Sequence, residues 1–333
     1  MTTATLDVAT LETLVSAAVA APSILNTQPW RFRLDPDTVT VEIRAATERG
    51  LRHIDPTGRA LHLSVGCAVL NLRVAVAHFG WEPVTRLLPR PEEPDLLATV
   101  RLAGPARNST APRLYDAVWR RHSSRFPFSE RPLPSAVLTE LGEAARAEGA
   151  LLSRPVPRDT DRLLRLTWEA ERRNTADADR AAESRHWVQD GPGSAALGMA
   201  PGTLGPQDFR DRIPMRDFGA HRHPAALPSR PFETRPLLAT VTTAHDRRAD
   251  WLRAGQALER VLLVATARGV RASLLHQALE WPDLRDELGS RSGESRDHVQ
   301  MVLRLGYGPE GPPSPRRTAR QELVEDAARS VLR

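Results

Sequence analysis

The sequence predicts an α+β protein built from two related units in tandem. A helix that ends at a glycine and leads into a short strand occurs twice, once at Gly80 and once at Gly269. A further strand of similar composition follows each of these passages. Because a repeated order of helix and strands indicates duplicated units, we place the first unit at residues 1–108 and the second at residues 109–333.

The first unit has two expected helices and four expected strands. Apolar residues at helical spacing predict a helix over residues 11–19, and Pro22 ends it because proline lacks an N–H donor. A long apolar helix is expected over residues 59–79, with Gly80 just past its end. The expected strands cover residues 31–34, 39–43, 81–88 and 97–103.

The second unit is longer and carries more helix. The expected helices cover residues 113–121, 135–148, 159–187 and 250–268, with a short one near 322–332. The helix over 250–268 is so apolar near its end that we expect it to be buried on nearly all sides. The expected strands cover residues 151–152, 237–243, 270–275 and 299–305.

A segment rich in glycine and proline interrupts the second unit. Fourteen of the forty-nine residues from 188 to 236 are Gly or Pro, which excludes long regular elements. Apolar residues such as Met199, Phe209 and Phe218 recur within it and could pack on a neighbouring surface. We therefore expect an ordered lid rather than a mobile loop, and we call residues 188–236 the lid segment.

Composition narrows the class of protein. The hydrophobic fraction of 41 % excludes global disorder. No stretch approaches about 18 consecutive apolar residues and no basic start precedes an apolar run, so we expect no membrane span, no export and a cytoplasmic location. Every basic residue is arginine, and a net charge of +5 with interspersed acidic residues forms no basic stripe. Nucleic-acid binding is therefore the least favoured alternative.

Cysteine and histidine usage gives no sign of a metal centre. A single cysteine, Cys67, cannot form an internal disulfide, and its apolar neighbours indicate a buried structural residue. His221 and His223 lie close together on the lid segment, but no third ligand stands at motif spacing. We expect a structural or surface role for these two histidines.

The loop over residues 21–30 is more polar than a simple connection requires. Ser23, Asn26 and Gln28 offer hydrogen-bond donors and acceptors on a backbone that two prolines, Pro22 and Pro29, have stiffened. Such a loop could hold a flat ligand with polar edges. It could equally be a capped loop in which Ser23 and Asn26 satisfy local backbone groups.

A basic stretch, residues 121–125, follows the first helix of the second unit. Arg121, His122, Ser123 and Arg125 place cationic and hydroxyl donors within one turn, as phosphate binding requires. Taken alone, the stretch also fits a solvated basic helix end, where arginine complements the helix dipole.

These two stretches, and two more, resemble motifs of the nitroreductase family of flavin-dependent oxidoreductases. Residues 22–30 are similar to the PSxxNxQPW loop that contacts FMN, and residues 121–125 to the RRSxR or RHSxK stretch that grips the FMN phosphate and ribityl chain. Residues 269–277 resemble the segment whose backbone amides face the flavin ring, and residues 313–317 the basic C-terminal stretch that adds an arginine to the phosphate site. The whole chain is similar to the fused, single-chain Acg-type branch.

The resemblance implies an α+β nitroreductase-like fold that binds FMN. In that family two identical subunits form each site, whereas this chain keeps the 21–30 loop once and the basic stretch once. A pseudo-dimer with one complete flavin site is implied, as a monomer or a further homodimer. The implied flavin contacts are Pro22, Ser23, Asn26, Gln28, Arg121, His122, Ser123, Arg125, Leu275, His276, Gln277, Arg316 and Arg317.

The implied activity is hydride transfer from NAD(P)H through flavin to a small molecule such as a nitroaromatic or a quinone. No catalytic acid or base is nominated, since the cofactor supplies the redox chemistry. His276 departs from the pattern of many relatives, which have an acidic residue followed by glycine at this place. The alternative is a flavin-storing protein whose lid segment closes over the cofactor and excludes the reductant.

Overall fold

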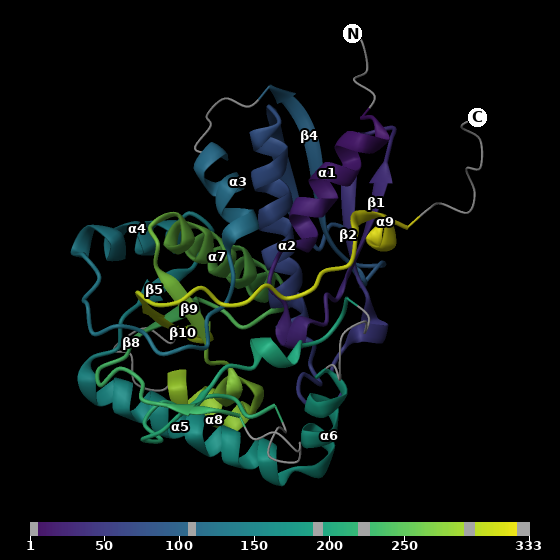
Figure 1. Ribbon diagram of the computed structural model, residues 1–333. Coiled ribbons are helices and arrows are strands. Elements are labelled where there is room, and N and C mark those ends of the chain that lie inside the picture. Colours follow the sequence, from purple (N-terminus) through teal and green to yellow (C-terminus); the bar gives the residue numbers. More distant parts are fainter. Residues whose placement is uncertain (1–5, 106–110, 189–195, 219–226, 290–296, 325–333) are drawn as a thin grey trace.

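Two antiparallel sheets of four strands form the framework of the protein (Figure 1). The computed structural model describes residues 6–105, 111–188, 196–218, 227–289 and 297–324. The first sheet has the order β1-β2-β4-β3, and the second has the order β5-β8-β10-β9. Their strands are β1 (Trp30–Asp35), β2 (Thr40–Ala45), β3 (Trp81–Leu87), β4 (Leu96–Pro105), β5 (Leu151–Ser153), β8 (Leu237–Thr243), β9 (Arg271–Leu274) and β10 (His298–Gly306).

The two sheets share one topology. Numbered by their order along the chain, the strands of each sheet lie side by side in the order first, second, fourth, third. All neighbouring strands are antiparallel. A helix precedes the first strand of each sheet, namely α1 (Val8–Val19) and α4 (Ser135–Arg146). A long helix joins the second and third strands, namely α2 (Arg59–His78) and α7 (Arg248–Ala267). The α+β class is thus confirmed, whereas the unit boundary at residue 108 stays a prediction.

The helices α2 and α7 cross at two glycines. Gly66 and Gly255 are each the eighth residue of a 20-residue helix. A Cβ added to Gly66 would lie 2.3 Å from the carbonyl oxygen of Leu252, and one added to Gly255 would lie 2.1 Å from that of Leu63. Only glycine permits this approach of the two backbones. Around the crossing, one continuous apolar core joins both units.

The helix expected over residues 159–187 is two helices, α5 (Pro157–Ala176) and α6 (Ala178–His186). The prediction of one helix was wrong because Asp177 adopts an extended backbone between them, and its carboxylate accepts the backbone N–H groups of Asp179 and Arg180. This is N-capping, which a short acidic side chain favours. The other helices expected before residue 322 are confirmed, among them α3 (Ala111–Arg120).

Most apolar residues in the described part of the lid segment are buried, but Phe209 is 71 % exposed and does not act as an anchor. Met199, Leu204 and Phe218 join a small apolar cluster with Leu25 of the 21–30 loop. The segment includes a short parallel pair, β6 (Gln207–Asp208) with β7 (Ser229–Arg230). The expected order is therefore present in residues 196–218, while His221 and His223 lie outside the described residues.

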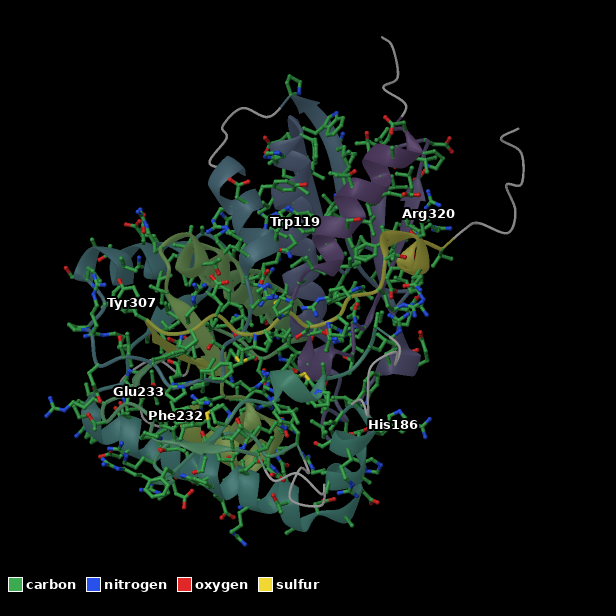
Figure 2. The ribbon with its side chains drawn as sticks, in the orientation of Figure 1. Trp119, His186, Phe232, Glu233, Tyr307 and Arg320 are labelled. Carbon is green, nitrogen blue, oxygen red and sulfur yellow. The ribbon has the colours of Figure 1, made fainter. Side chains whose placement is uncertain are left out.

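The C-terminal segment, residues 309–324, runs from the second sheet to the edge of the first, where α9 (Ala319–Glu322) lies (yellow in Figure 1). We call it the tail. The N–H group of Val324 donates to the carbonyl oxygen of Phe32 in β1 at 2.8 Å. Arg320 on the tail points to solvent at the surface (Figure 2). The short helix expected near residues 322–332 lies mostly outside the described residues and stays a prediction.

Among the described residues, α2 is the helix that is long and apolar enough to cross a membrane by length and composition. Its most apolar window is 83 % buried inside the protein, as expected of a core helix.

Candidate functional site

One cavity collects most of the predicted site residues. It lies between the 21–30 loop, the start of α2, the basic stretch, the lid segment and the tail, and encloses about 1470 Å³ including its mouth to solvent. Ten of the thirteen predicted residues line it: Pro22, Ser23, Asn26, Arg121, His122, Ser123, Arg125, His276, Gln277 and Arg316. Segments from both units and from the tail therefore meet at one place.

Three predicted residues lie behind the cavity wall. Gln28 is fully buried, and its amide links the lid segment to the tail by donating to Ala196 O at 2.5 Å and accepting from Arg317 N at 3.0 Å. Leu275 is only 1 % exposed and packs in an apolar cluster. The side chain of Arg317 turns to Glu322, 2.5 Å away. These three residues support the site without lining it.

The 21–30 loop holds an unusual backbone. Leu25, Asn26 and Gln28 have φ angles of 45°, 55° and 48°, a left-handed region that costs non-glycine residues energy. Ser23 Oγ accepts the N–H of Gln28 at 2.9 Å, so the capping interpretation of that residue holds locally. Backbone strain kept in place by surrounding contacts is typical of ligand sites.

Asn26 connects three distant segments at the cavity. Its Oδ1 accepts from Arg316 Nη1 at 2.7 Å, and its Nδ2 donates to the carbonyl oxygens of Gly198 at 2.8 Å and Pro315 at 3.0 Å. The loop, the lid segment and the tail are thus joined by one amide.

One end of the cavity concentrates positive charge. Arg121 is 4 % exposed and donates from Nη2 to Ala20 O at 3.3 Å. Burial, then the charge of Arg121, lowers the pKa of Arg316 to about 9, and burial with the same two arginines lowers the pKa of His122. The Nε atoms of Arg121 and Arg316 have no hydrogen-bond partner among the described residues. A donor set of this kind fits a phosphate group.

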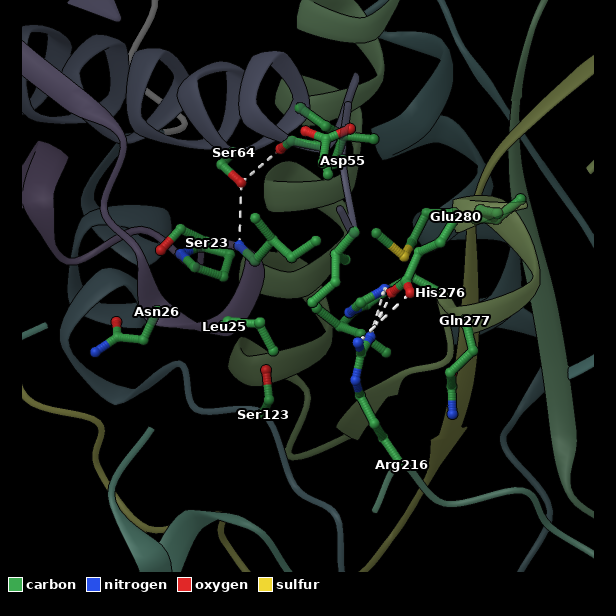
Figure 3. A pocket seen from close by; sticks show the side chains of 18 of the residues that line it. Ser23, Leu25, Asn26, Asp55, Ser64, Ser123, Arg216, His276, Gln277 and Glu280 are labelled. Carbon is green, nitrogen blue, oxygen red and sulfur yellow. Dashed lines mark hydrogen bonds and ion pairs between the residues drawn. The ribbon is translucent and has the colours of Figure 1, made fainter. Parts of the chain in front are cut away.

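The other end of the cavity is covered by Arg216, a side chain of the lid segment. Arg216 bonds to Glu280, and His276 Nδ1 lies 2.6 Å from Glu280 Oε1 (Figure 3). Burial opposes ionisation of Glu280, but Arg216 and His276 outweigh it and lower its pKa to about 2. Burial lowers the pKa of His276 despite its acidic partner. Glu280 therefore stays ionised and fastens the lid segment to the cavity wall.

Sequence reasoning missed several charged residues of the cavity. Arg59, Arg180, Arg216 and Glu280 all line it, and none belongs to a recognised motif. Arg216 and Glu280 lie 64 residues apart in sequence, so no local pattern announces their pairing. Among the described residues, no cluster of three His, Cys, Asp or Glu side chains could hold a metal ion.

Two four-stranded α+β halves thus flank an arginine-rich cavity whose donors suit a small anionic ligand. No family model matches the chain. The "Putative NAD(P)H nitroreductase Rv3131" of Mycobacterium tuberculosis is 32 % identical over 322 residues, covering 95 % of this chain and 91 % of that protein. The chain belongs to the nitroreductase family.

Further similar proteins have the same family name. The "Putative NAD(P)H nitroreductase acg" of Mycobacterium tuberculosis is 27 % identical over 317 residues, covering 95 % of this chain and 94 % of that one. Two solved nitroreductases with bound FMN, from Bacteroides fragilis and Desulfitobacterium hafniense, are 16 % and 13 % identical, with TM-scores of 0.36 and 0.40. They cover 66 % and 64 % of this chain, and 98 % of each solved chain is matched.

Proposed function

We propose that the protein is an FMN-dependent NAD(P)H oxidoreductase that reduces a small acceptor such as a nitroaromatic or a quinone. The observation that carries the proposal is the meeting of Asn26, Arg121 and Arg316 at one cavity, although they come from three distant parts of the chain. The names of the two mycobacterial relatives, which include NAD(P)H nitroreductase, support it.

The residues that line the cavity fit FMN in their positive charge and in the arrangement of their hydrogen-bond donors. Arg121, Arg316 and Ser123 would hold the phosphate group, because guanidinium and hydroxyl donors match its oxygens. Gln277 would lie at a polar edge of the ring, and Asn26 would position Arg316 by accepting its Nη1 donor. When bound, FMN supplies the hydride chemistry. The protein would orient the ring and exclude water from it. The end of the cavity that Arg216 covers is suited to this role.

We further propose that the chain is a fused pseudo-dimer with one flavin site. The common order of the two sheets supports duplication. In the first unit α1 leads into the polar 21–30 loop, whereas in the second unit α4 leads to Glu148, which binds Arg73 and Arg260. A network of ion pairs thus occupies the position in the second unit that corresponds to the 21–30 loop of the first. On this proposal the cytoplasmic protein functions as a monomer or as a homodimer, which its mass in solution distinguishes.

A flavin-storing protein is the alternative, and one observation favours it. The lid segment is fastened across the cavity by Arg216 and Glu280, which would keep a nicotinamide away from a bound flavin. Anaerobic mixing of the flavin-loaded protein with NADH or NADPH separates the two functions. Rapid bleaching of the flavin absorbance supports the oxidoreductase, and a flavin that stays oxidised supports storage. A colourless protein that refuses added FMN contradicts both.

A further inference from the structure

Glu259 is a buried acid directly behind the cationic end of the cavity. It lies on α7, is 0 % exposed, and neither carboxylate oxygen has a hydrogen-bond partner among the described residues. Its Oε1 lies 3.4 Å from Nε of Arg121. An ionised carboxylate without hydrogen bonds is costly in a protein interior. The charge of Arg121 is the strongest of the influences that favour the ionised form of Glu259.

Few other groups face Glu259. Arg316 approaches from the tail, and Cys67 and Asn71 approach from α2. Burial raises the pKa of the Cys67 thiol well above its usual value, so that group is neutral. Burial raises the pKa of Glu259 to about 7, although Arg121, Asn71 and Arg316 act in the opposite direction. Two cations and one acid that titrates near neutrality thus share this end of the cavity.

A phosphate group would change this balance. The phosphate of FMN is a dianion above about pH 6, and it would bind the arginine that now compensates Glu259. Two further negative charges paired with the same arginine would disfavour the ionised form of this buried carboxyl group. Protonation of Glu259 removes the repulsion, and solvent supplies the proton.

We infer that Glu259 is the internal counter-ion of the phosphate site, and that FMN binding is accompanied by uptake of one proton at its carboxyl group. The inference rests on the proposed function. Glu259 acts through Arg121 and is a positioning residue. It holds the guanidinium of Arg121 in place while the cavity contains no anion. It takes up a proton and becomes neutral when a phosphate group pairs with that guanidinium.

The experiment is calorimetric titration of FMN into the full-length chain freed of flavin, at about pH 8 in buffers of different ionisation enthalpy. The buffer dependence of the heat gives the number of protons taken up. We expect close to one proton for FMN and none for riboflavin, which lacks the phosphate. The Kd for FMN should rise about tenfold between about pH 7 and pH 8.5, because ionised Glu259 must be protonated on binding.

Two variants separate this role from simple structural support. Glu259→Gln removes the titrating group but keeps its size, so proton uptake should vanish and FMN binding should become independent of pH and tighter than wild type at about pH 8. Glu148→Gln is the matched control, because it alters another buried acid that pairs with two arginines outside the cavity. It should keep the uptake of the wild type.

The outcomes are distinct. FMN binding without proton uptake in the wild type overturns the role of Glu259 and leaves the proposed function standing. Absence of binding of either flavin overturns the proposed function itself. Should Glu259→Gln not fold, the wild type still tests the role of Glu259, because FMN binding at about pH 8 without proton uptake overturns it.

Discussion

Asn26 and Arg316 lie 290 residues apart in sequence, yet Nη1 of Arg316 donates to Oδ1 of Asn26 at 2.7 Å. This contact joins the loop of the first unit to the tail. It also fixes the direction of the Arg316 guanidinium, which lines the cavity and whose Nε has no hydrogen-bond partner in the part of the chain that the structure describes.

The first prediction concerns this arginine. Arg316→Ala should weaken FMN binding about 10- to 100-fold, because a charge-assisted hydrogen bond contributes about 1.5–3 kcal/mol. Quenching of flavin fluorescence measures the Kd. Arg320→Ala is the control, since Arg320 lies on the same tail but is 80 % exposed. Equal affinities in the two variants would remove Arg316 from the phosphate site.

The second prediction concerns the covered end of the cavity. Arg216→Gln breaks the buried contact with Glu280 and should loosen the lid segment. We expect faster bleaching of the flavin by NADH or NADPH in anaerobic stopped-flow, by about tenfold or more, since loss of one partner of a buried pair costs about 3–5 kcal/mol. Arg210→Gln, an exposed change on the same segment, should leave the rate unaltered. An unchanged rate in Arg216→Gln would show that this contact does not limit access.

The third prediction concerns the pH dependence of stability. Glu171 is 6 % exposed and accepts the N–H of Asp217 in the lid segment at 2.7 Å. Burial raises its pKa from 4.5 to about 7. The folded chain then holds the proton more tightly than the unfolded chain, so this stabilisation is fully present below about pH 4.5 and lost as the pH rises through about 7.

The Glu171→Gln variant has no titrating group at this position. Its free energy of unfolding minus that of the wild type should therefore rise by about 3 kcal/mol from about pH 4 to pH 8. Urea denaturation at both pH values measures it. Glu169→Gln should change with the opposite sign, because hydrogen bonds from Arg173 and Arg172 lower the pKa of Glu169. A difference that does not vary with pH would mean that Glu171 has the same pKa in the folded and unfolded chains.

The fourth prediction tests the helix crossing. Gly66→Ala would put a methyl group 2.3 Å from a backbone oxygen of α7, which the main chain can relieve only by moving. We expect a loss of at least about 3 kcal/mol in the free energy of unfolding. Gly104→Ala, where nothing lies within 4 Å of the added carbon, is the control. Equal stability of the two variants would show that α2 and α7 can separate freely.

The sequence predicted the site best where its chemistry is local. The 21–30 loop and the basic stretch are short runs of polar residues, and both line the cavity. A motif marks a segment, however, and does not give the direction of every side chain in it. Leu275 and Gln28 belong to the motifs, but their side chains turn into the interior.

Contacts between distant segments escaped prediction. Glu259 lies on α7 just before its apolar end, and only the fold places it behind Arg121. The pairing of Arg216 with Glu280 depends on where the lid segment crosses the cavity. The break at Asp177 was missed for a different reason, since the polar stretch around it has little apolar periodicity from which to read a helix end.

The tail has a consequence for proteolysis. The last strand of the second sheet ends at Gly306, so the strands of both sheets precede Arg316 in the chain. A single cut between Gly306 and Arg316 should release a bound ligand while both sheets persist, because the tail carries one of the arginines of the cavity.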